Sequence, residues 1–550
     1  MSINEHLGLK INKFTSNPRW KMQRNIELEK VTSTDKWDFI VIGGGASGLG
    51  IALDAASRGY KTLLLEGYDF AKGTSSRSTK LVHGGVRYLA AGNVALVKEA
   101  LRERGRLAKN ASHLFKNQNF IIPNYNFIDS VKYRVGLGLY DYLSGDLSLG
   151  KTIAINKDTT MQRLPTLNGT DLKNGVVYKD GQFDDSRLAI NIAQTVVEQG
   201  GTVLNYAKVT ELLKDGQGKI NGVKFTDELN GEQYSVHGTA VINATGVFMN
   251  EVLSMDHGTD KKFVVPSQGV HLVLDKSFLP SDDALMIPKT SDGRVLFAVP
   301  WHERLVVGTT DTLVKEPSYE PVALEQEIQF ILDTAGQYLT KKPTRDDVLS
   351  IFAGLRPLAA PEKVGQSTKE VSRSHKVVVS DSGLVTITGG KWTTYRQMSE
   401  DTVDEALKVH PQLAKKACVT TKLAIHGKIP AEQVDLKNHL YIYGADIPAI
   451  KALEAENPAM TEKIHPRHPN TIAEVVWAAR QEMAQSVEDV LARRVRLLFL
   501  DVRAAMDSAA KVANILAKEL GKDAQWEKEQ TEKFLNIAKH YLLVDYMPQV

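Results

Sequence analysis

The hydrophobic residues of the chain change their spacing along the sequence, and each spacing predicts a different element. Phe39 to Ile42 is an apolar run, a glycine-rich segment follows it, and a helical stretch then precedes a second apolar run that ends at Glu66. This order predicts a strand, a tight turn, a helix and a second strand, as at the start of an α/β domain. In the stretch 93–115 the apolar residues share one helical face, which predicts a helix packed on that sheet.

Between about 116 and 345 the segments are shorter and richer in strand patterns, with apolar alternation in 270–274. This pattern predicts a largely antiparallel sheet. Two buried-type strands that end in glycine, 240–246 and 384–390, predict returns of the chain to the first sheet. From about 420 onward helical spacing dominates, which predicts a separate helical domain.

We therefore expect an α/β protein whose Rossmann-like domain carries an inserted, largely antiparallel β domain and a C-terminal all-α domain. The C-terminal helices are expected to begin with capping boxes at Thr471 and Ser486. The expected limits are 1–36 for a solvated N-terminal extension, 37–115 with 185–250 and 345–405 for the discontinuous cofactor domain, 116–184 with 251–344 for the substrate domain, and 420–550 for the helical domain.

Composition narrows the function classes without choosing among them. Hydrophobic residues make up 42% of the chain and charged residues 24%, as in soluble globular proteins, which argues against disorder and fibrous repeats. The charge balance of 68 basic and 65 acidic side chains, +3, gives no nucleic-acid footprint. The single cysteine, Cys418, excludes an internal disulfide and a multi-cysteine metal site, and we expect no metal. Without an apolar run of 18 residues or the apolar core of a secretion signal, we expect a cytoplasmic protein, which still allows a peripheral position on a membrane.

The glycine turn carries the first chemical signal. Gly43, Gly45 and Gly48 lie between a strand and a helix, and Glu66 ends the second strand. This context predicts a dinucleotide site, in which the glycines let the backbone approach a pyrophosphate at the helix N-terminus. Glu66 can accept a hydrogen bond from a ribose 2′-hydroxyl and would repel a 2′-phosphate, so NADP is disfavoured.

The segment 73–89 favours FAD over NAD. It is dense in hydroxyl groups, glycines and cations that could line a flat ring system and its phosphate linker, and an NAD site has little use for so long a loop. With the glycines of the two returning strands, the further residues expected at the cofactor are Thr74, Ser75, Ser78, Lys80, His83, Gly84, Gly85, Gly246 and Gly390.

Ordered motifs from about residue 35 to the C-terminus extend this interpretation. They are IGGGASG (42–48), GTSSRSTKLVHGGVRYL (73–89), DDSRL (184–188), INATG (242–246), GVHLVL (269–274), VVGTTDT (306–312), GLRPL (354–358), EVSRSH (370–375), TGGKWTTYR (388–396) and EDVLARR (488–494). In these the chain resembles the FAD-dependent glycerol-3-phosphate dehydrogenases and is similar to the α-glycerophosphate oxidases. Two departures, Val247-Phe248 in place of Pro-Trp and Trp392 in place of an aliphatic residue, bear on local packing.

The resemblance implies oxidation of sn-glycerol 3-phosphate to dihydroxyacetone phosphate, with electrons passing from FAD to a quinone. It also implies a peripheral enzyme on the cytoplasmic face of the inner membrane. The substrate is a small dianion, and the short motifs hold cations suited to it: Arg87, Arg356, Arg373 and Lys391. We assign Arg373 and Lys391 chiefly to the phosphate.

Oxidation of the C2 alcohol requires removal of its proton and transfer of a hydride. We assign the catalytic roles to His271 and Arg356, because the resemblance places the matching histidine at the substrate and a cation favours the developing alkoxide. Tyr88 and Thr394 are expected to orient the substrate or the flavin.

Two other functions remain open at this point, an oxidase that produces hydrogen peroxide and a non-catalytic nucleotide-binding module. Only 16 residues separate Arg356 from Arg373, where oxidases that resemble this family often carry a long insertion, so the dehydrogenase is favoured. We expect Asp185 and Arg187 to form a structural pair. The C-terminal arginines 480, 493, 494 and 496 are expected on a solvated or subunit-contacting face, and a homodimer is left open. The apolar and basic segment 131–140 suits either a membrane surface or a core helix with a charged edge.

Overall fold

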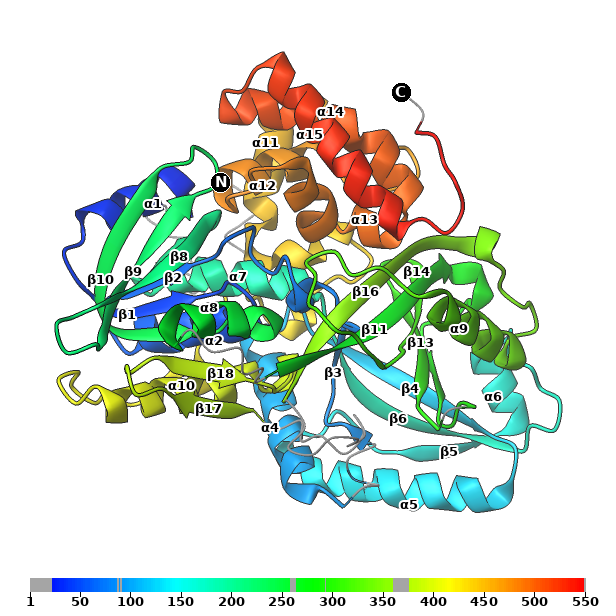
Figure 1. The fold of residues 1–550 in the computed structure, drawn as a ribbon. Helices are drawn as coiled ribbons and strands as arrows, with labels where there is room; N and C mark the ends of the chain where they lie inside the picture. The colour runs from blue at the N-terminus through cyan, green and yellow to red at the C-terminus, as the bar shows by residue number, and fades with distance from the viewer. Residues whose placement is uncertain are drawn as a thin grey trace, which may run out of the picture.

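Two β-sheets and a helical domain make up the protein. The computed structural model describes residues 22–86, 89, 92–257, 264–291, 293–359 and 375–548. The two sheets lie side by side, and the C-terminal helices lie across their upper ends in the view of Figure 1. These helices are α11 (Ile447–Glu456), α12 (Ile472–Gln481), α13 (Leu497–Leu500), α14 (Val502–Leu520) and α15 (Ala524–Ala538). Within the part of the chain described, no helix is both long and apolar enough to cross a membrane.

The first sheet has the parallel core of a Rossmann-like domain. Its strands follow the order β17-β18-β10-β1-β2-β7, with a hairpin of β8 and β9 attached to β10. The neighbours β18, β10, β1, β2 and β7 run parallel. The strands are β1 (Trp37–Ile42), β2 (Thr62–Leu65), β7 (Thr202–Leu204), β8 (Ala207–Lys214), β9 (Ile220–Asp227), β10 (Gln233–Asn243), β17 (Lys376–Val379) and β18 (Val385–Thr388). Segments from three parts of the sequence therefore return to one sheet, as predicted.

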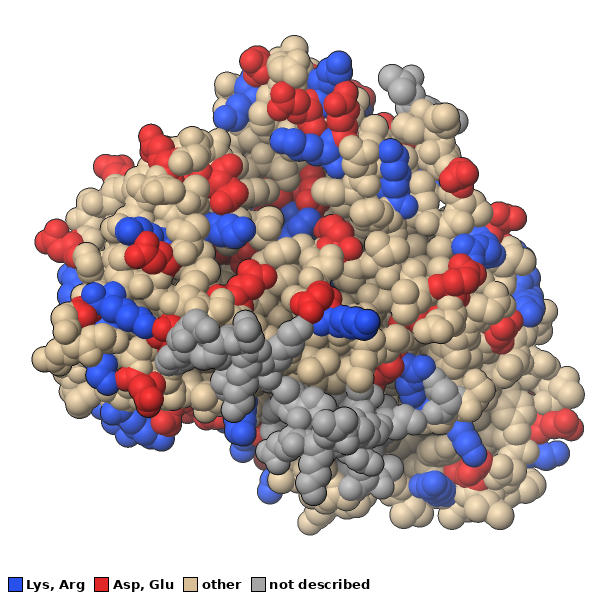
Figure 2. All heavy atoms as spheres, viewed as in Figure 1, with Lys and Arg blue, Asp and Glu red and all other residues tan. Residues whose placement is uncertain are grey.

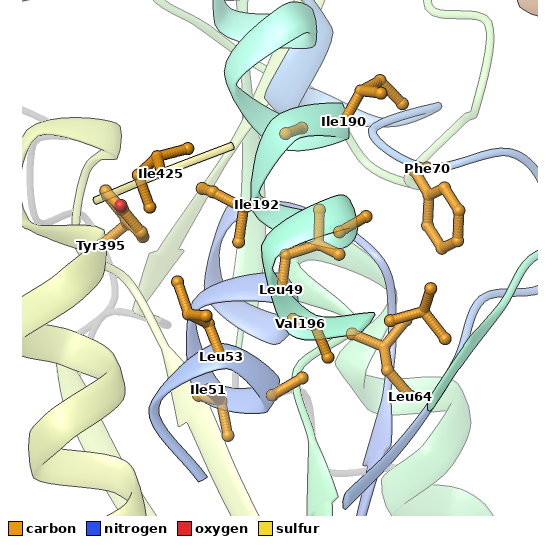
Figure 3. Close-up of a cluster of buried hydrophobic side chains, with 14 of the residues drawn as sticks. Leu49, Ile51, Leu53, Leu64, Phe70, Ile190, Ile192, Val196, Tyr395 and Ile425 are labelled. Carbon is orange, nitrogen blue, oxygen red and sulfur yellow. The ribbon is translucent and has the colours of Figure 1, made fainter. Parts of the chain in front are cut away.

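A buried hydrophobic cluster holds helices against this sheet (Figure 3). Helix α2 (Ala46–Ser57) packs against both α7 (Asp185–Glu198) and α10 (Tyr395–Val409). Leu53 of α2 and Val196 of α7 are buried in the cluster, which fixes the N-terminus of α2 relative to the strands. The predicted helix in 93–115 is α4 (Val94–Asn110), whose N-cap Asn93 accepts from the backbone of Leu96.

The second sheet is largely antiparallel, as expected. Its order is β15-β11-β14-β13-β12-β4-β6-β3, with β16 paired to β11 and β5 to β6. Its strands are β3 (Leu81–Val82), β4 (Lys116–Asn124), β5 (Ile153–Asn156), β6 (Asn174–Gln182), β11 (Val264–Asp275), β12 (Ala284–Ile287), β13 (Leu296–Trp301), β14 (Arg304–Gly308), β15 (Thr312–Leu313) and β16 (Val348–Ala359). The expected cofactor-domain segment 345–405 thus begins in a strand of the second sheet, because β16 hydrogen-bonds β11 along its length.

Two terminal regions refine the sequence-based picture. The part of the expected solvated extension that the structure describes forms α1 (Arg24–Ser33), which buries Val31 and pairs Arg24 with Asp227 at 2.8 Å. In the C-terminal domain, Thr471 and Glu474 form the predicted capping box at the start of α12. The second predicted box, at Ser486, precedes a π-helix over Asp489–Arg494 rather than an α-helix.

Candidate functional site

The glycine turn shapes the floor of a first cavity. A Cβ atom at Gly43 would lie 2.8 Å from the carbonyl oxygen of Ala244 on the neighbouring strand, and one at Gly48 would lie 1.8 Å from the carbonyl oxygen of Gly43. Only glycine fits these positions, because the backbones of β1, α2 and the end of β10 meet there. Gly45 is the N-cap of α2, so the helix N-terminus opens into the cavity.

Glu66 lies at the end of β2, on the cavity wall. Its carboxylate accepts hydrogen bonds from the backbone nitrogens of Gly44 (2.5 Å) and Tyr68 (2.9 Å). Burial raises the pKa of this carboxyl, and the two backbone donors oppose that rise. The side chain is thereby held in one orientation beside the glycine turn.

The loop after β2 closes the cavity on another side. Ser75 Oγ accepts from the backbone nitrogen of Ala46 at 2.9 Å, and Thr74 Oγ1 donates to the carbonyl of Leu355 at 2.6 Å. The indole of Trp392 donates to the carbonyl of Ser75 at 2.9 Å. Trp392, one of the two departures from the family pattern, therefore ties this loop to the end of β18.

The second departure contributes an aromatic wall. The ring of Phe248 stacks on Tyr319 with centroids 3.8 Å apart and planes 8° apart. Tyr319 in turn contacts Tyr68 at 4.3 Å. All three line the first cavity, as does Gly246, whose φ of +60° favours glycine.

A second cavity continues from the first. The loop at Thr74 and the turn after β18 border both cavities. The lining residues common to the two are Thr74, Pro357, Gly389, Gly390, Lys391 and Trp392. An elongated ligand can therefore lie with one end at the glycine turn and the other end in the second cavity, beside the strands of the second sheet. FAD fits this shape, since the cradle supplies backbone donors and a helix N-terminus for the pyrophosphate and Glu66 for the ribose.

The second cavity gathers cations, imidazoles and hydroxyl groups. Of the residues predicted from sequence, it is lined by Thr74, Ser78, His83, Gly85, His271, Arg356, Gly390 and Lys391. Further polar residues line this cavity that the sequence analysis did not assign individually, although all but Arg294 lie in its motifs: Arg77, Thr79, Arg294, Thr309, Thr310, Asp311 and Thr393. Ser78 Oγ donates to Asp185 at 2.7 Å, which fixes the loop beneath the cavity.

His271 lies on β11 with its ring almost completely buried, at 2% exposure. The ring stacks on Phe352 of β16 with centroids 4.8 Å apart, and Nε2 lies 2.9 Å from Thr79 Oγ1. Burial, together with the charges of Lys80 and Arg356, holds the pKa of this imidazole well below its ordinary value. His271 is therefore neutral near pH 7 and faces the cavity rather than water.

Arg356 reaches the same region from β16. Its guanidinium donates to the carbonyl of Thr310 at 3.2 Å and lies 3.5 Å from the carboxylate of Asp311. A Cβ atom at Gly269 would lie 2.4 Å from Arg356 Nη2, so this glycine leaves the space for the guanidinium. Gly269 and His271 share one face of β11, which brings the two predicted catalytic side chains together.

Besides Gly48, which packs against the backbone of Gly43, three predicted site residues lie away from the lining of both cavities. Lys80 is fully buried behind His271, where Nζ donates to Asp185 (2.7 Å) and to the carbonyl of Ser76 (2.6 Å), and burial lowers its pKa to about 7. The backbone nitrogen of Gly84 donates to the Tyr140 hydroxyl at 2.7 Å, against α4.

The third is Thr394, whose hydroxyl is buried and turns back to the carbonyl of Lys391 at 3.3 Å. Its neighbour Thr393 lines the cavity instead and accepts from the backbone of His83 at 3.2 Å. Both threonines lie in a 3₁₀ helix (Trp392–Thr394), where neighbouring side chains point in different directions, so the sequence alone does not determine which of them faces the cavity. The predicted substrate residues Arg87, Tyr88 and Arg373 lie outside the described residues.

Charged residues that the sequence placed on a surface form a buried network instead. Asp185 pairs with Lys80 (2.7 Å) and Arg496 (3.0 Å), whereas Arg187 pairs with Glu482, so Asp185 and Arg187 do not form the expected mutual pair. Arg493, Arg494 and Arg496 are at most 2% exposed and connect the C-terminal domain to the loop beside the cofactor cradle. Only Arg480 of the four C-terminal arginines is on the surface, paired with Glu519 at 2.6 Å.

Comparison with known proteins agrees with the geometry. Residues 38–396 match the family of FAD-dependent oxidoreductases, and residues 384–529 match the C-terminal domain of α-glycerophosphate oxidase. A probable mitochondrial glycerol-3-phosphate dehydrogenase of Dictyostelium discoideum is 38% identical over 95% of this chain and 86% of its own. A mitochondrial glycerol-3-phosphate dehydrogenase of Arabidopsis thaliana is 38% identical over 94% of this chain and 87% of its own.

The fold is also shared with a solved structure. The glycerol-3-phosphate dehydrogenase of Bacillus halodurans, complexed with FAD, superposes with a TM-score of 0.78 at 27% identity, over 96% of this chain and all of that one. The predicted α/β fold with its C-terminal helical domain is confirmed, and FAD is the cofactor. The chain belongs to the family of FAD-dependent glycerol-3-phosphate dehydrogenases.

Proposed function

We propose that this chain oxidises sn-glycerol 3-phosphate to dihydroxyacetone phosphate and passes the electrons to a quinone. The observation that carries the proposal is the meeting of Arg356, His271 and Lys391 around a cavity continuous with the cofactor cradle. The relatives named as glycerol-3-phosphate dehydrogenases support the same substrate. A non-catalytic nucleotide-binding module would have no use for this second cavity.

The proposed chemistry divides between the cofactor and the side chains. FAD, when bound, accepts the hydride that leaves C2. Lys391, with Arg373, binds the phosphate and fixes C2 in place. The positive charge of Arg356 favours the developing negative charge on the C2 oxygen, and neutral His271 is the base on which the proton released from the hydroxyl group is finally held. A water-excluding wall of β11 and β16 strengthens both interactions.

Substrate choice tests this proposal. Turnover should be measured with sn-glycerol 3-phosphate, its enantiomer sn-glycerol 1-phosphate, and glycerol, using a soluble quinone analogue as acceptor. We expect activity with the first, because a cationic pocket and a fixed C2 position select both the phosphate and the configuration. Equal activity with glycerol would contradict a phosphate-binding role for the cations.

The electron acceptor separates the dehydrogenase from the oxidase. The short spacing between Arg356 and Arg373 favours the dehydrogenase. Turnover with the quinone analogue should therefore greatly exceed turnover with oxygen as sole acceptor. Hydrogen peroxide formed at the rate of substrate oxidation would instead identify an oxidase.

We infer that α5 (Phe127–Ser144) is the part of the chain that lies on a membrane surface. One side of this helix buries Leu137 and Tyr140, but the other exposes Phe127 (70%), Ile128 (81%) and Val135 (69%) to solvent. Exposed apolar residues beside cations are typical of a helix at the lipid interface, and Lys132 and Arg134 are exposed on the same helix. In Figure 1 the helix forms the edge of the molecule opposite the C-terminal domain.

Vesicle binding tests this inference. Replacing Ile128, Val131 and Val135 by Ser should abolish co-sedimentation with anionic phospholipid vesicles, because it removes the apolar surface that inserts. A matched control replaces three exposed apolar residues on other elements, Leu229, Val322 and Leu436, and should bind as the wild type does. Equal binding by both variants would contradict the role of α5.

Other expectations about partners stay predictions. Lys and Arg side chains mingle with Asp and Glu over the face drawn in Figure 2. That nucleic acid is no partner stays a prediction from the charge balance of the sequence. A position on the cytoplasmic face of the inner membrane and a homodimer are likewise proposals; the relatives from Dictyostelium and Arabidopsis are named as mitochondrial.

A further inference from the structure

Thr79 lies against His271 in the lining of the second cavity, where a substrate would bind. Its hydroxyl oxygen lies 2.9 Å from His271 Nε2, and the residue is half-buried in the lining of the second cavity. Thr79 comes from the loop between β2 and β3, whereas His271 is on β11, so two parts of the chain 192 residues apart create the contact.

The buried histidine ring presents little of its surface to the cavity that it borders. It is 2% exposed, stacks on Phe352, and is bounded by β14, where a Cβ atom at Gly308 would lie 2.4 Å from His271 Cδ2. His271 Nδ1 is buried and makes no hydrogen bond to any described residue. Nε2 is therefore the nitrogen that can exchange a proton with the cavity, and the Thr79 hydroxyl lies directly on it.

We propose that Thr79 is a catalytic residue that carries the proton of the substrate C2 hydroxyl to His271. The C2 O–H bond breaks and its proton passes to Thr79 Oγ1, while the hydroxyl proton of Thr79 passes to His271 Nε2. The C2–H bond breaks at the same centre, its electron pair leaves as a hydride to FAD, and C2=O forms. The alcohol is oxidised, the cofactor is reduced, and Thr79 ends with one proton, as it began.

The surrounding charges suit this role. Burial, Lys80 and Arg356 keep His271 neutral, so Nε2 is able to accept a proton before substrate binds. The carboxylate of Asp185, 2.7 Å from Lys80 Nζ, offsets part of the positive charge behind the ring. A dianionic substrate adds negative charge on the cavity side, and this charge favours the imidazolium that the transfer creates.

The inference rests on the proposed function, and one set of variants tests it. Thr79→Val removes the hydroxyl with little change of shape, whereas Thr79→Ser keeps it. We expect Thr79→Val to slow anaerobic flavin reduction by sn-glycerol 3-phosphate on the order of 10²-fold, the lower range for general-base assistance. Thr79→Ser should stay within about threefold of the wild type because the relay atom is retained. FAD content should be equal in all three proteins.

Two further readouts separate a relay from a structural effect. In a His271→Asn background Thr79→Val should cause little additional loss, since residues of one proton path are not additive. In the resting protein, the ¹⁵N resonance of His271 Nε2 should shift in Thr79→Val and return in Thr79→Ser, which reports the hydrogen bond without turnover.

Each outcome decides the matter. Wild-type flavin that sn-glycerol 3-phosphate does not reduce overturns the proposed function. A reducible wild type with an equally fast Thr79→Val variant overturns the relay alone, as does a Thr79→Ser variant that is as slow as Thr79→Val. If Thr79→Val loses FAD, Thr79→Ala replaces it as the variant without a hydroxyl group. Comparing Thr79→Ala with Thr79→Ser then tests the relay in the same way.

Discussion

Arg494 and Asp69 form a bidentate ion pair in the interior, with Nη1 to Oδ2 at 2.7 Å and Nη2 to Oδ1 at 2.9 Å. Arg493 contributes a third bond to the same carboxylate at 2.5 Å. Although burial opposes ionisation, these two cations hold the pKa of Asp69 below its ordinary value. The pair joins the C-terminal helical domain to the loop that follows β2, and this loop also supplies Thr74, Ser75 and Thr79 to the cavities.

Removing the carboxylate should therefore destabilise the protein strongly. Asp69→Asn removes the carboxylate that both buried arginines share. Arg493 keeps Glu488 and Asp489, but Arg494 keeps only the longer contact to Glu482 at 3.4 Å among the ion pairs of the described residues, so we expect a loss of about 3 kcal/mol. We expect a lower urea midpoint and weaker FAD retention, measured on the holoenzyme by tryptophan and flavin fluorescence.

The matched control is the surface pair of exposed Arg480 and half-buried Glu519. Glu519→Gln should change stability by about 0–1 kcal/mol, because solvent screens that pair. Similar losses in both variants would show that burial does not distinguish the two interactions.

Glu66→Ala should weaken retention of FAD. Its carboxylate is oriented beside the glycine turn by two backbone donors, ready to accept from a ribose hydroxyl. Loss of a hydrogen bond to a charged group costs on the order of 1–3 kcal/mol, so the dissociation constant should rise about 5- to 150-fold. Dialysis followed by flavin absorbance measures this, with the exposed Glu232→Ala as control; equal flavin in the two variants would count against the ribose contact.

Arg356→Ala should lower kcat more than it raises KM. The guanidinium acts on charge that develops in the transition state, and loss of such a donor reduces the rate roughly 10²- to 10³-fold. Steady-state kinetics with sn-glycerol 3-phosphate checks the split, with Arg345→Ala on the surface as the control. A rise in KM at constant kcat would reassign Arg356 to ground-state binding.

The rate of flavin reduction should fall at acidic pH, where His271 becomes protonated and can no longer act as a base. This acidic limb of the pH profile should lie at an unusually low pH. A histidine is a base only above its pKa, and the pKa of His271 is lowered well below 6.5 by burial and by the facing cations Lys80 and Arg356. The neutral form is therefore retained as the pH falls through 6.5, and the limb lies below that value.

Anaerobic stopped flow against pH measures this limb in the wild type, His271→Asn and the control His540→Asn, a change at an exposed histidine of the C-terminal domain. We expect only His271→Asn to remove it, together with a loss of about 10²- to 10⁴-fold in rate. A limb at or above pH 6.5 that disappears in His271→Asn would contradict the depressed pKa.

The local signals of the sequence predicted the parts of the site that short motifs determine. The glycine turn, Glu66 and the alternating strand around His271 all depend on neighbours within a few residues, and the structure has them at the cavities. Thr79 could not be predicted in this way, because its partner His271 lies 192 residues away.

The same limit explains the buried arginines. Arg493 and Arg494 stand among acidic residues in the sequence, a pattern that resembles a solvated helix face, and their partner Asp69 lies more than 400 residues earlier. Likewise, the expected domain limit at 345 assigned β16 to the cofactor domain, but its long register with β11 places it in the second sheet. Tertiary pairing, rather than local periodicity, decided both outcomes.

The most direct test of the account is anaerobic mixing of the purified, FAD-loaded protein with sn-glycerol 3-phosphate, unlabelled and deuterated at C2, in a stopped-flow spectrophotometer. We predict loss of the oxidised flavin absorbance, and a slower loss with the deuterated substrate, because the C2–H bond breaks as the hydride leaves. Flavin absorbance that stays unchanged after mixing would contradict the account.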